Sequence, residues 1–134
     1  HKQTLALTRD LNGLYKNEKT LHEVDFDPEG FQWVDASDWE SSIISYLRKD
    51  AGGEEIILCV FNFTPVVRDN YQIGVPKSGF WQEIFNSDAQ DYGGSGQGNN
   101  GSLETAPAPA HGHPFLLNLT LPPIGGVLLK WKKE

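Results

Sequence analysis

The sequence predicts an all-β domain, an antiparallel β-sandwich preceded by a short N-terminal helix. From residue 41 onward, short runs of β-branched and aromatic residues alternate with Gly, Pro and Asn turn signals. No helical pattern recurs between these runs, which excludes a parallel α/β sheet. The run at 54–65 is apolar on both strand faces, so it should lie in the middle of a covered sheet.

The first 40 residues are predicted to be a helix and a connecting loop, and residues 41–134 to be the all-β domain. Leu7, Leu11, Leu14 and Tyr15 fall on one helical face, and Gly13 weakens the end, so the helix should cover about 2–12. Residues 17–40 show no sustained period and are expected to be irregular. Within them, the segment 37–40 has capping-box form and could begin a single helical turn.

The later elements follow from the same pattern. Strands are expected at 43–48, 55–63, 71–75, 80–85, 115–121 and 127–131. A hairpin turn at 50–53 joins the first two of these strands. The Gly- and Asn-rich segment 88–101 and the Pro-spaced segment 106–114 are expected to be loops.

The two apolar faces of the 55–63 strand require two covers. One face should pack inside the sandwich, and the other should be covered by the N-terminal segment, with Leu7, Leu11 and Leu14 as candidate partners. The alternative cover is the 17–40 loop with Phe26, Phe31 and Trp33 pointing inward. Under either arrangement Cys59, in the most apolar stretch, should be a buried and unreactive thiol.

Composition limits the classes of function. A chain of 134 residues suits one domain, and its net charge of −7 argues against a nucleic-acid partner. No apolar run is long enough to span a membrane, so no membrane partner is expected. The single cysteine cannot form an internal disulfide, which fits a reducing cytoplasmic compartment. The chain has no methionine and begins with His1, so we expect a fragment or a processed product.

The polar clusters favour structural roles over catalysis. The Gly-rich segment 88–101 lacks the Lys-Ser/Thr pair of a phosphate-binding loop. His111 and His113 have no third ligand at useful spacing, so no metal or cofactor is predicted. A glycosidase-like site needs two carboxylates that face each other across a cleft, and no such pair is expected here. Turn and cap roles are therefore favoured for one group of acidic residues. That group comprises Asp25, Asp27, Glu29, Asp35 and Asp38.

Three aromatic residues are the candidate binding residues. Trp33, Trp39 and Tyr92 are predicted to lie in or beside loops, whereas Trp81 falls within an expected strand. Exposed flat rings can stack on sugar faces, where polarised C–H groups meet the π-cloud. The alternative is that each ring packs into the sandwich or into an interface.

Several motifs occur together in a recognisable order. They are the segments Leu21–Trp33, Asn62–Arg68, Tyr71–Pro76, Trp81–Asp88, Tyr92–Ser95 and Leu121–Pro123. Taken together, they resemble the C-terminal part of bacterial 1,4-α-glucan (glycogen) branching enzymes, of the α-amylase superfamily. The resemblance implies a Greek-key-type β-sandwich and a helix from the end of a catalytic (β/α)-barrel in the same polypeptide.

The resemblance also implies a function for the parent protein. The parent would cut an α-1,4-glucan chain and transfer it to a 6-hydroxyl, making the α-1,6 branches of glycogen by the retaining route. No catalytic motif of the barrel is present, so no catalytic residue is assigned and the chain alone is expected to be inactive. The domain would brace the barrel and contact α-glucan through Trp33, Trp39 or Tyr92. The alternative is a stand-alone β-sandwich that binds carbohydrate or protein without catalysis.

Overall fold

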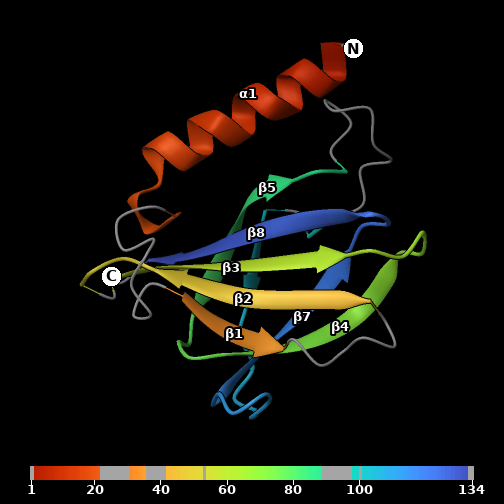
Figure 1. The fold of residues 1–134 in the computed structure, drawn as a ribbon. Helices are drawn as coiled ribbons and strands as arrows, with labels where there is room; N and C mark the ends of the chain where they lie inside the picture. The colour runs from red at the N-terminus through yellow and green to blue at the C-terminus, as the bar shows by residue number, and fades with distance from the viewer. Residues whose placement is uncertain are drawn as a thin grey trace.

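The structure is a β-sandwich with one helix lying across its larger sheet (Figure 1). It is a computed structural model that describes residues 2–21, 31–35, 42–52, 54–88, 98–99 and 101–132. The helical elements are α1 (Lys2–Asn17) and the 3-10 turn η1 (Lys19–Leu21). The strands are β1 (Phe31–Asp35), β2 (Ile43–Lys49), β3 (Glu55–Asn62), β4 (Arg68–Val75), β5 (Phe80–Asn86), β6 (Ser102–Glu104), β7 (Phe115–Leu121) and β8 (Gly125–Lys132).

Two antiparallel sheets form the sandwich. The larger sheet has six strands in the order β1-β2-β3-β8-β5-β6, and the smaller sheet pairs β4 with β7. The chain therefore crosses to the small sheet twice, for β4 after β3 and for β7 after β6, and it finally returns to place β8 between β3 and β5. This arrangement confirms the predicted antiparallel all-β class and the interior position of the 55–63 strand.

The main core lies between the two sheets. Ile56, Leu58 and Val60 of β3 point into it and are at most 2% exposed. Opposite them, β4 and β7 contribute alternating apolar side chains, as expected for sheets that bury one face. The other buried members of this core are Ile43, Leu47, Ile73, Val75, Trp81, Leu117, Leu119, Leu121, Val127 and Leu129.

A second apolar cluster covers the opposite face of β3. Ile57 and Cys59 are buried there together with Phe85 and Leu128 from the neighbouring strands. Leu7 and Leu14 of α1 pack against this cluster, and Leu21 of η1 joins them. The predicted cover by the N-terminal segment is therefore confirmed.

The expectation that Leu11 also packs against this face of β3 is wrong. Its side chain remains 40% exposed and is not part of the second cluster. It lines a cavity between α1 and the sheet, because the helix does not close onto the sheet along its whole length.

Polar contacts hold the C-terminal end of α1 on the sheet. The Lys130 Nζ lies 2.7 Å from Glu18 Oε2 and 3.6 Å from Glu55 Oε2. Burial lowers the pKa of Lys130, but the two carboxylates outweigh it and raise that pKa above its ordinary value. Arg48 Nη2 also donates a 3.0 Å hydrogen bond to the Leu21 carbonyl. We call this set of contacts (Glu18, Leu21, Arg48, Glu55 and Lys130) the polar clasp.

Helix α1 ends later than predicted, at Asn17 rather than near residue 12. A helical glycine costs about 1 kcal/mol, which underlies the expectation that Gly13 ends the helix. Packing of Leu14 against the second cluster offsets this cost, since burying a leucine contributes about 1.5–3 kcal/mol. Tertiary packing thus extends the helix by a full turn beyond the glycine.

Strand β1 lies inside the segment that was expected to be irregular. It pairs with β2 through Phe31↔Arg48, Gln32↔Leu47 and Trp33↔Tyr46. Strand β6 and the first residues of β4 were also not predicted. The possible helical turn at 37–40 falls outside the described residues. Within the described ranges, no helix combines the length and apolar composition needed to cross a lipid bilayer.

The Cys59 thiol is confirmed as buried, with 2% exposure. Burial raises its pKa to about 12, although a hydrogen bond with the Tyr46 side chain and the charge of Arg48 act in the opposite direction. Because the thiolate is the reactive form, a thiol with this pKa is almost entirely inert near neutral pH.

We expect Leu14→Ala to lower the free energy of unfolding by about 2 kcal/mol, since it removes part of the cover of β3. The matched control is Leu5→Ala on the same helix. Leu5 is 69% exposed, so its replacement should change the free energy by less than about 0.5 kcal/mol. Urea melts of both variants measure the difference. Equal midpoints would show that α1 does not stabilise the sandwich.

We also expect a thiol reagent at neutral pH to leave native Cys59 unmodified and to react fully once denaturant is added. The reagent cannot reach the buried sulfur, and the raised pKa of Cys59 keeps the thiol protonated. Release of the chromophore from an aromatic disulfide reagent measures the reaction. Rapid labelling of the native domain would contradict the burial of this face of β3.

Candidate functional site

A row of four aromatic rings crosses the outer face of the large sheet. Trp33 of β1 meets Tyr46 of β2 edge-on, with ring centroids 5.8 Å apart and an interplanar angle of 79°. Tyr46 stacks on Phe61 of β3 at 6.1 Å, and Phe61 stacks on Phe63 at 6.5 Å. We call Trp33, Tyr46, Phe61 and Phe63 the aromatic row.

The register between neighbouring strands places these rings side by side on one face of the sheet. Trp33 lies directly opposite Tyr46 in the β1–β2 ladder, so their side chains share a face. Phe61 lies opposite Gly126 of β8, and a Cβ on that glycine would come within 2.5 Å of the Phe61 ring. Gly126 therefore makes room for the Phe61 ring to lie flat on the neighbouring strand.

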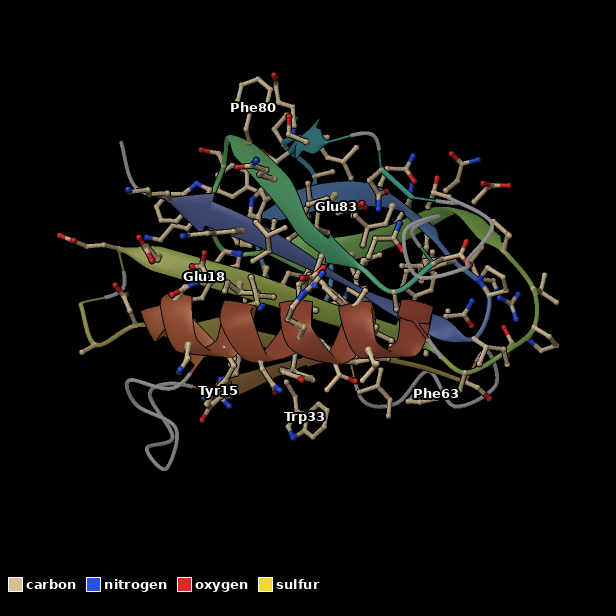
Figure 2. The ribbon with its side chains drawn as sticks, turned by 90° about the horizontal axis from the view of Figure 1, so that it is seen from above. Tyr15, Glu18, Trp33, Phe63, Phe80 and Glu83 are labelled. Carbon is tan, nitrogen blue, oxygen red and sulfur yellow. The ribbon has the colours of Figure 1, made fainter. Side chains whose placement is uncertain are left out.

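The two ends of the row are open to solvent. Trp33 is 53% exposed and Phe63 is 59% exposed, whereas Tyr46 and Phe61 are half-buried. Figure 2 shows Trp33 and Phe63 on the same flank of α1, with Phe63 beside the N-terminal end of the helix. Burial raises the pKa of the Tyr46 hydroxyl above its ordinary value, and the neighbouring Cys59 adds to the shift.

A cavity of about 440 Å³ lies between α1 and the aromatic row. Its walls are almost entirely apolar. The main residues lining it are Leu7, Leu11, Leu21, Tyr46, Cys59, Phe61, Phe63, Phe85, Ile124 and Leu128. Trp33 does not line this cavity, but the other three rings of the row do, including Tyr46, which contacts Trp33.

The polar side chains in the cavity wall are already hydrogen-bonded. Asn62 Nδ2 donates to the carbonyls of Val66 and Pro122, each at 2.9 Å. Its Oδ1 accepts from the Thr64 amide and hydroxyl. Ser87 Oγ accepts a 2.8 Å hydrogen bond from the Gly126 amide. The cavity thus suits an apolar group better than a hydroxylated one.

The structure describes one of the three predicted contact residues. Trp33 lies on the edge strand β1 rather than in a loop, and its exposure excludes the alternative of a ring in the core. Trp39 and Tyr92 fall outside the described residues.

The other polar candidates give no catalytic or metal site within the described ranges. His111 is exposed, and its Nδ1 accepts a 3.1 Å hydrogen bond from the Gly74 amide. His113 is half-buried, and burial together with Lys49 and His111 lowers its pKa. No group of three or more potential metal ligands occurs among the described residues. The acidic group lies outside them, apart from the backbone of Asp35.

Sequence reasoning missed Tyr46, Phe61 and Phe63 as parts of a surface. Each was assigned to a strand, but their meeting depends on the register between β1, β2 and β3. The signal available in the sequence was the placement of Phe61 and Phe63 on the same face of one strand.

Comparison with known proteins gives consistent matches. The model of the alpha amylase C-terminal all-beta domain family matches residues 33–132. The 1,4-alpha-glucan branching enzyme GlgB of Aquifex aeolicus is 57% identical over 130 residues, which are 97% of this chain and 21% of that enzyme. The enzyme of the same name from Aromatoleum aromaticum is 55% identical over 120 residues, 90% of this chain and 19% of the enzyme.

A more distant relative extends the match to the full length of the chain. The GlgB of Trichormus variabilis is 44% identical over 134 residues, which are 100% of this chain and 18% of that enzyme. The chain thus spans about a fifth of the length of these relatives. The antiparallel sandwich and the family match over residues 33–132 agree, and the chain belongs to the alpha-amylase C-terminal all-beta domain family.

Proposed function

We propose that this chain is the C-terminal domain of a 1,4-α-glucan branching enzyme. The observation that carries the proposal is 57% identity to such an enzyme over 97% of the chain. In the whole protein, a carboxylate of the catalytic barrel would displace part of an α-1,4-glucan chain and form a glycosyl-enzyme. A 6-hydroxyl of an acceptor glucan would then displace that carboxylate and create an α-1,6 branch. The buried, reduced thiol fits the proposed cytoplasmic location.

The first role proposed for the domain is to brace the barrel through α1. The helix uses Leu7 and Leu14 to pack on the sheet, while Leu5 is 69% exposed. Leu5 is nearly opposite these two leucines on the helical wheel, so it is available to a second partner. The polar clasp attaches the helix to the sandwich. A displacement of α1 by the barrel would therefore displace the whole domain with it. Residues 1–40 would accordingly connect the barrel to the strands at 41–134, with α1 and β1 also packing into the sandwich.

The second proposed role is contact with α-glucan at Trp33. The indole is more than half exposed and is supported from one side by Tyr46. A rigid exposed ring stacks on the apolar face of a glucose unit with little loss of side-chain entropy. Trp39 and Tyr92 remain further candidates for the same role.

We expect the 134-residue chain alone to have no branching activity. It carries the proposed bracing and contact surfaces, but the reaction requires the carboxylates of the barrel. Amylose incubated with the chain should keep its iodine absorbance spectrum, whereas the longer protein should shift it. A reproducible shift caused by the chain alone would contradict the assignment of catalysis to the rest of the polypeptide.

We expect Trp33→Ala to weaken binding of the chain to amylopectin about fivefold, because an aromatic contact of this kind contributes about 1 kcal/mol. Retardation in native gels that contain the polysaccharide measures the affinity. The control is Phe80→Ala, which removes a ring that is 61% exposed and lies far from Trp33 (Figure 2). Equal retardation of both variants would exclude Trp33 as a glucan contact.

A further inference from the structure

We infer that one end of the sandwich binds a phosphate-type dianion, either inorganic phosphate or the phosphate group of a sugar monoester. The binding groups belong to four residues that we call the basic cluster: Lys49, Lys77, His111 and His113. They come from the end of β2, the turn after β4 and the segment before β7. The inference goes beyond the proposed function and does not depend on it, because none of these residues belongs to the aromatic row or lines the cavity beside α1.

The register of the large sheet places Lys49 close to Trp131. Lys49 lies opposite Ile56 in the β2–β3 ladder, and Ile56 lies opposite Trp131 in the β3–β8 ladder. Since residues opposite each other share a face, Lys49 and Trp131 flank the buried Ile56 on the inner face of the sheet. Lys77 reaches the same end of the core from the turn after β4, because its Nζ lies 5.9 Å from the centroid of the Trp131 ring.

The small sheet brings His113 to this end as well. Val75, the last residue of β4, lies opposite Phe115, the first residue of β7. Lys77 and His113 are each two residues beyond this pair, so the two chains that leave the ladder carry one basic side chain each. Basic groups from both sheets are therefore gathered at one end of the sandwich.

A tight turn fixes His111 against β4. Ala110 and His113 exchange backbone hydrogen bonds of 3.0 and 2.8 Å, and the two residues between them, His111 and Gly112, have φ values of 52° and 76°. Two positive φ values in a two-residue loop are typical of a type I′ hairpin turn. The Gly74 amide donates a 3.1 Å hydrogen bond to Nδ1 of His111, so the neutral imidazole carries its proton on Nε2. A Cβ on Gly74 would overlap the Ala110 carbonyl oxygen, which explains the glycine at this close approach.

The basic groups act on one another electrostatically. Burial lowers the pKa of Lys49, and the charge of Lys77 lowers it further. Burial also lowers the pKa of His113, with additional contributions from Lys49 and His111. Neither lysine forms an ion pair within the described ranges, and the hydrogen-bond partner of Lys49 Nζ is the neutral Gln32 Oε1, at 2.8 Å. A bound anion would offset this repulsion.

A tetrahedral dianion suits the arrangement better than other ligands. The ammonium groups and the imidazole donors approach from two sheets, whereas a carboxylate offers two oxygens in a single plane. Lysine is a common phosphate ligand, and charge-assisted hydrogen bonds are about twice as strong as neutral ones. A neutral glucan would leave the positive charges uncompensated. A nucleic acid is disfavoured because the net charge of the chain is −7.

Calorimetric titration of the 134-residue chain near neutral pH and at constant ionic strength tests the inference. Inorganic phosphate and glucose 6-phosphate, titrated separately, should bind at one saturable site. Lys49→Gln and Lys77→Gln should each weaken binding about tenfold, because each removes a charge-assisted contact. The matched control is Arg9→Gln on α1, which removes the same charge from a side chain that is 77% exposed and should leave the affinity unchanged. Lys77 is exposed, so its variant should fold as the unaltered chain does, which a thermal melt checks.

Tighter binding of glucose 6-phosphate would support the site and identify a sugar monoester as its occupant. Equal or weaker binding of that ester would support the site with inorganic phosphate as the occupant. Absence of saturation up to about 10 mM of either anion would overturn the inference. An equal loss of affinity in Arg9→Gln would also overturn it, because net charge alone would then explain the binding. Unchanged affinity in a correctly folded Lys77→Gln variant would contradict the inference in the same way.

Discussion

Burial of β3 on both faces is the constraint on which the rest of the structure depends. The sandwich covers Ile56, Leu58 and Val60, but it leaves Ile57 and Cys59 on the outside of the large sheet. Each large apolar side chain left in water would forgo about 1.5–3 kcal/mol. Without a cover this outer face would be a surface prone to association. Helix α1 is therefore part of the folded domain, although it precedes the family match in sequence.

Apolar packing alone would not fix where α1 lies, because it has little directional preference. The polar clasp determines the position of the helix, because Lys130 forms ion pairs with Glu18 and Glu55, and Arg48 donates a hydrogen bond to the Leu21 carbonyl. All these contacts lie at the C-terminal end of the helix, whereas Leu7 and Leu11, nearer its N-terminus, line the cavity together with Leu21. The helix is consequently fixed at one end and incompletely packed at the other.

The sequence was sufficient for features that depend on local pattern. The two-sided burial of the 55–63 strand, the packing of Leu7 and Leu14 and the burial of Cys59 all follow from apolar spacing. Strand β1 could not be predicted, because it owes its form to pairing with β2 rather than to its own periodicity. The aromatic row was missed for the same reason, since register between strands brings its rings together. The left-handed backbone of Ile124, with a φ of +43°, has no sequence signal, because Gly125 and Gly126 beside it are the residues expected in such a conformation.

The two ends of the aromatic row differ in their surroundings. Trp33 lies on the edge strand β1 and does not line the cavity. Phe63 lines the largely apolar cavity beside α1. Tyr46 and Phe61 lie between these ends, are half-buried and also line the cavity, which therefore reaches three of the four rings. Trp33 meets the edge of Tyr46, whereas Tyr46, Phe61 and Phe63 stack in sequence, so each ring is packed against its neighbour. The position of the exposed Trp33 ring therefore depends on Tyr46, whose own ring is held against Phe61 of the central strand β3.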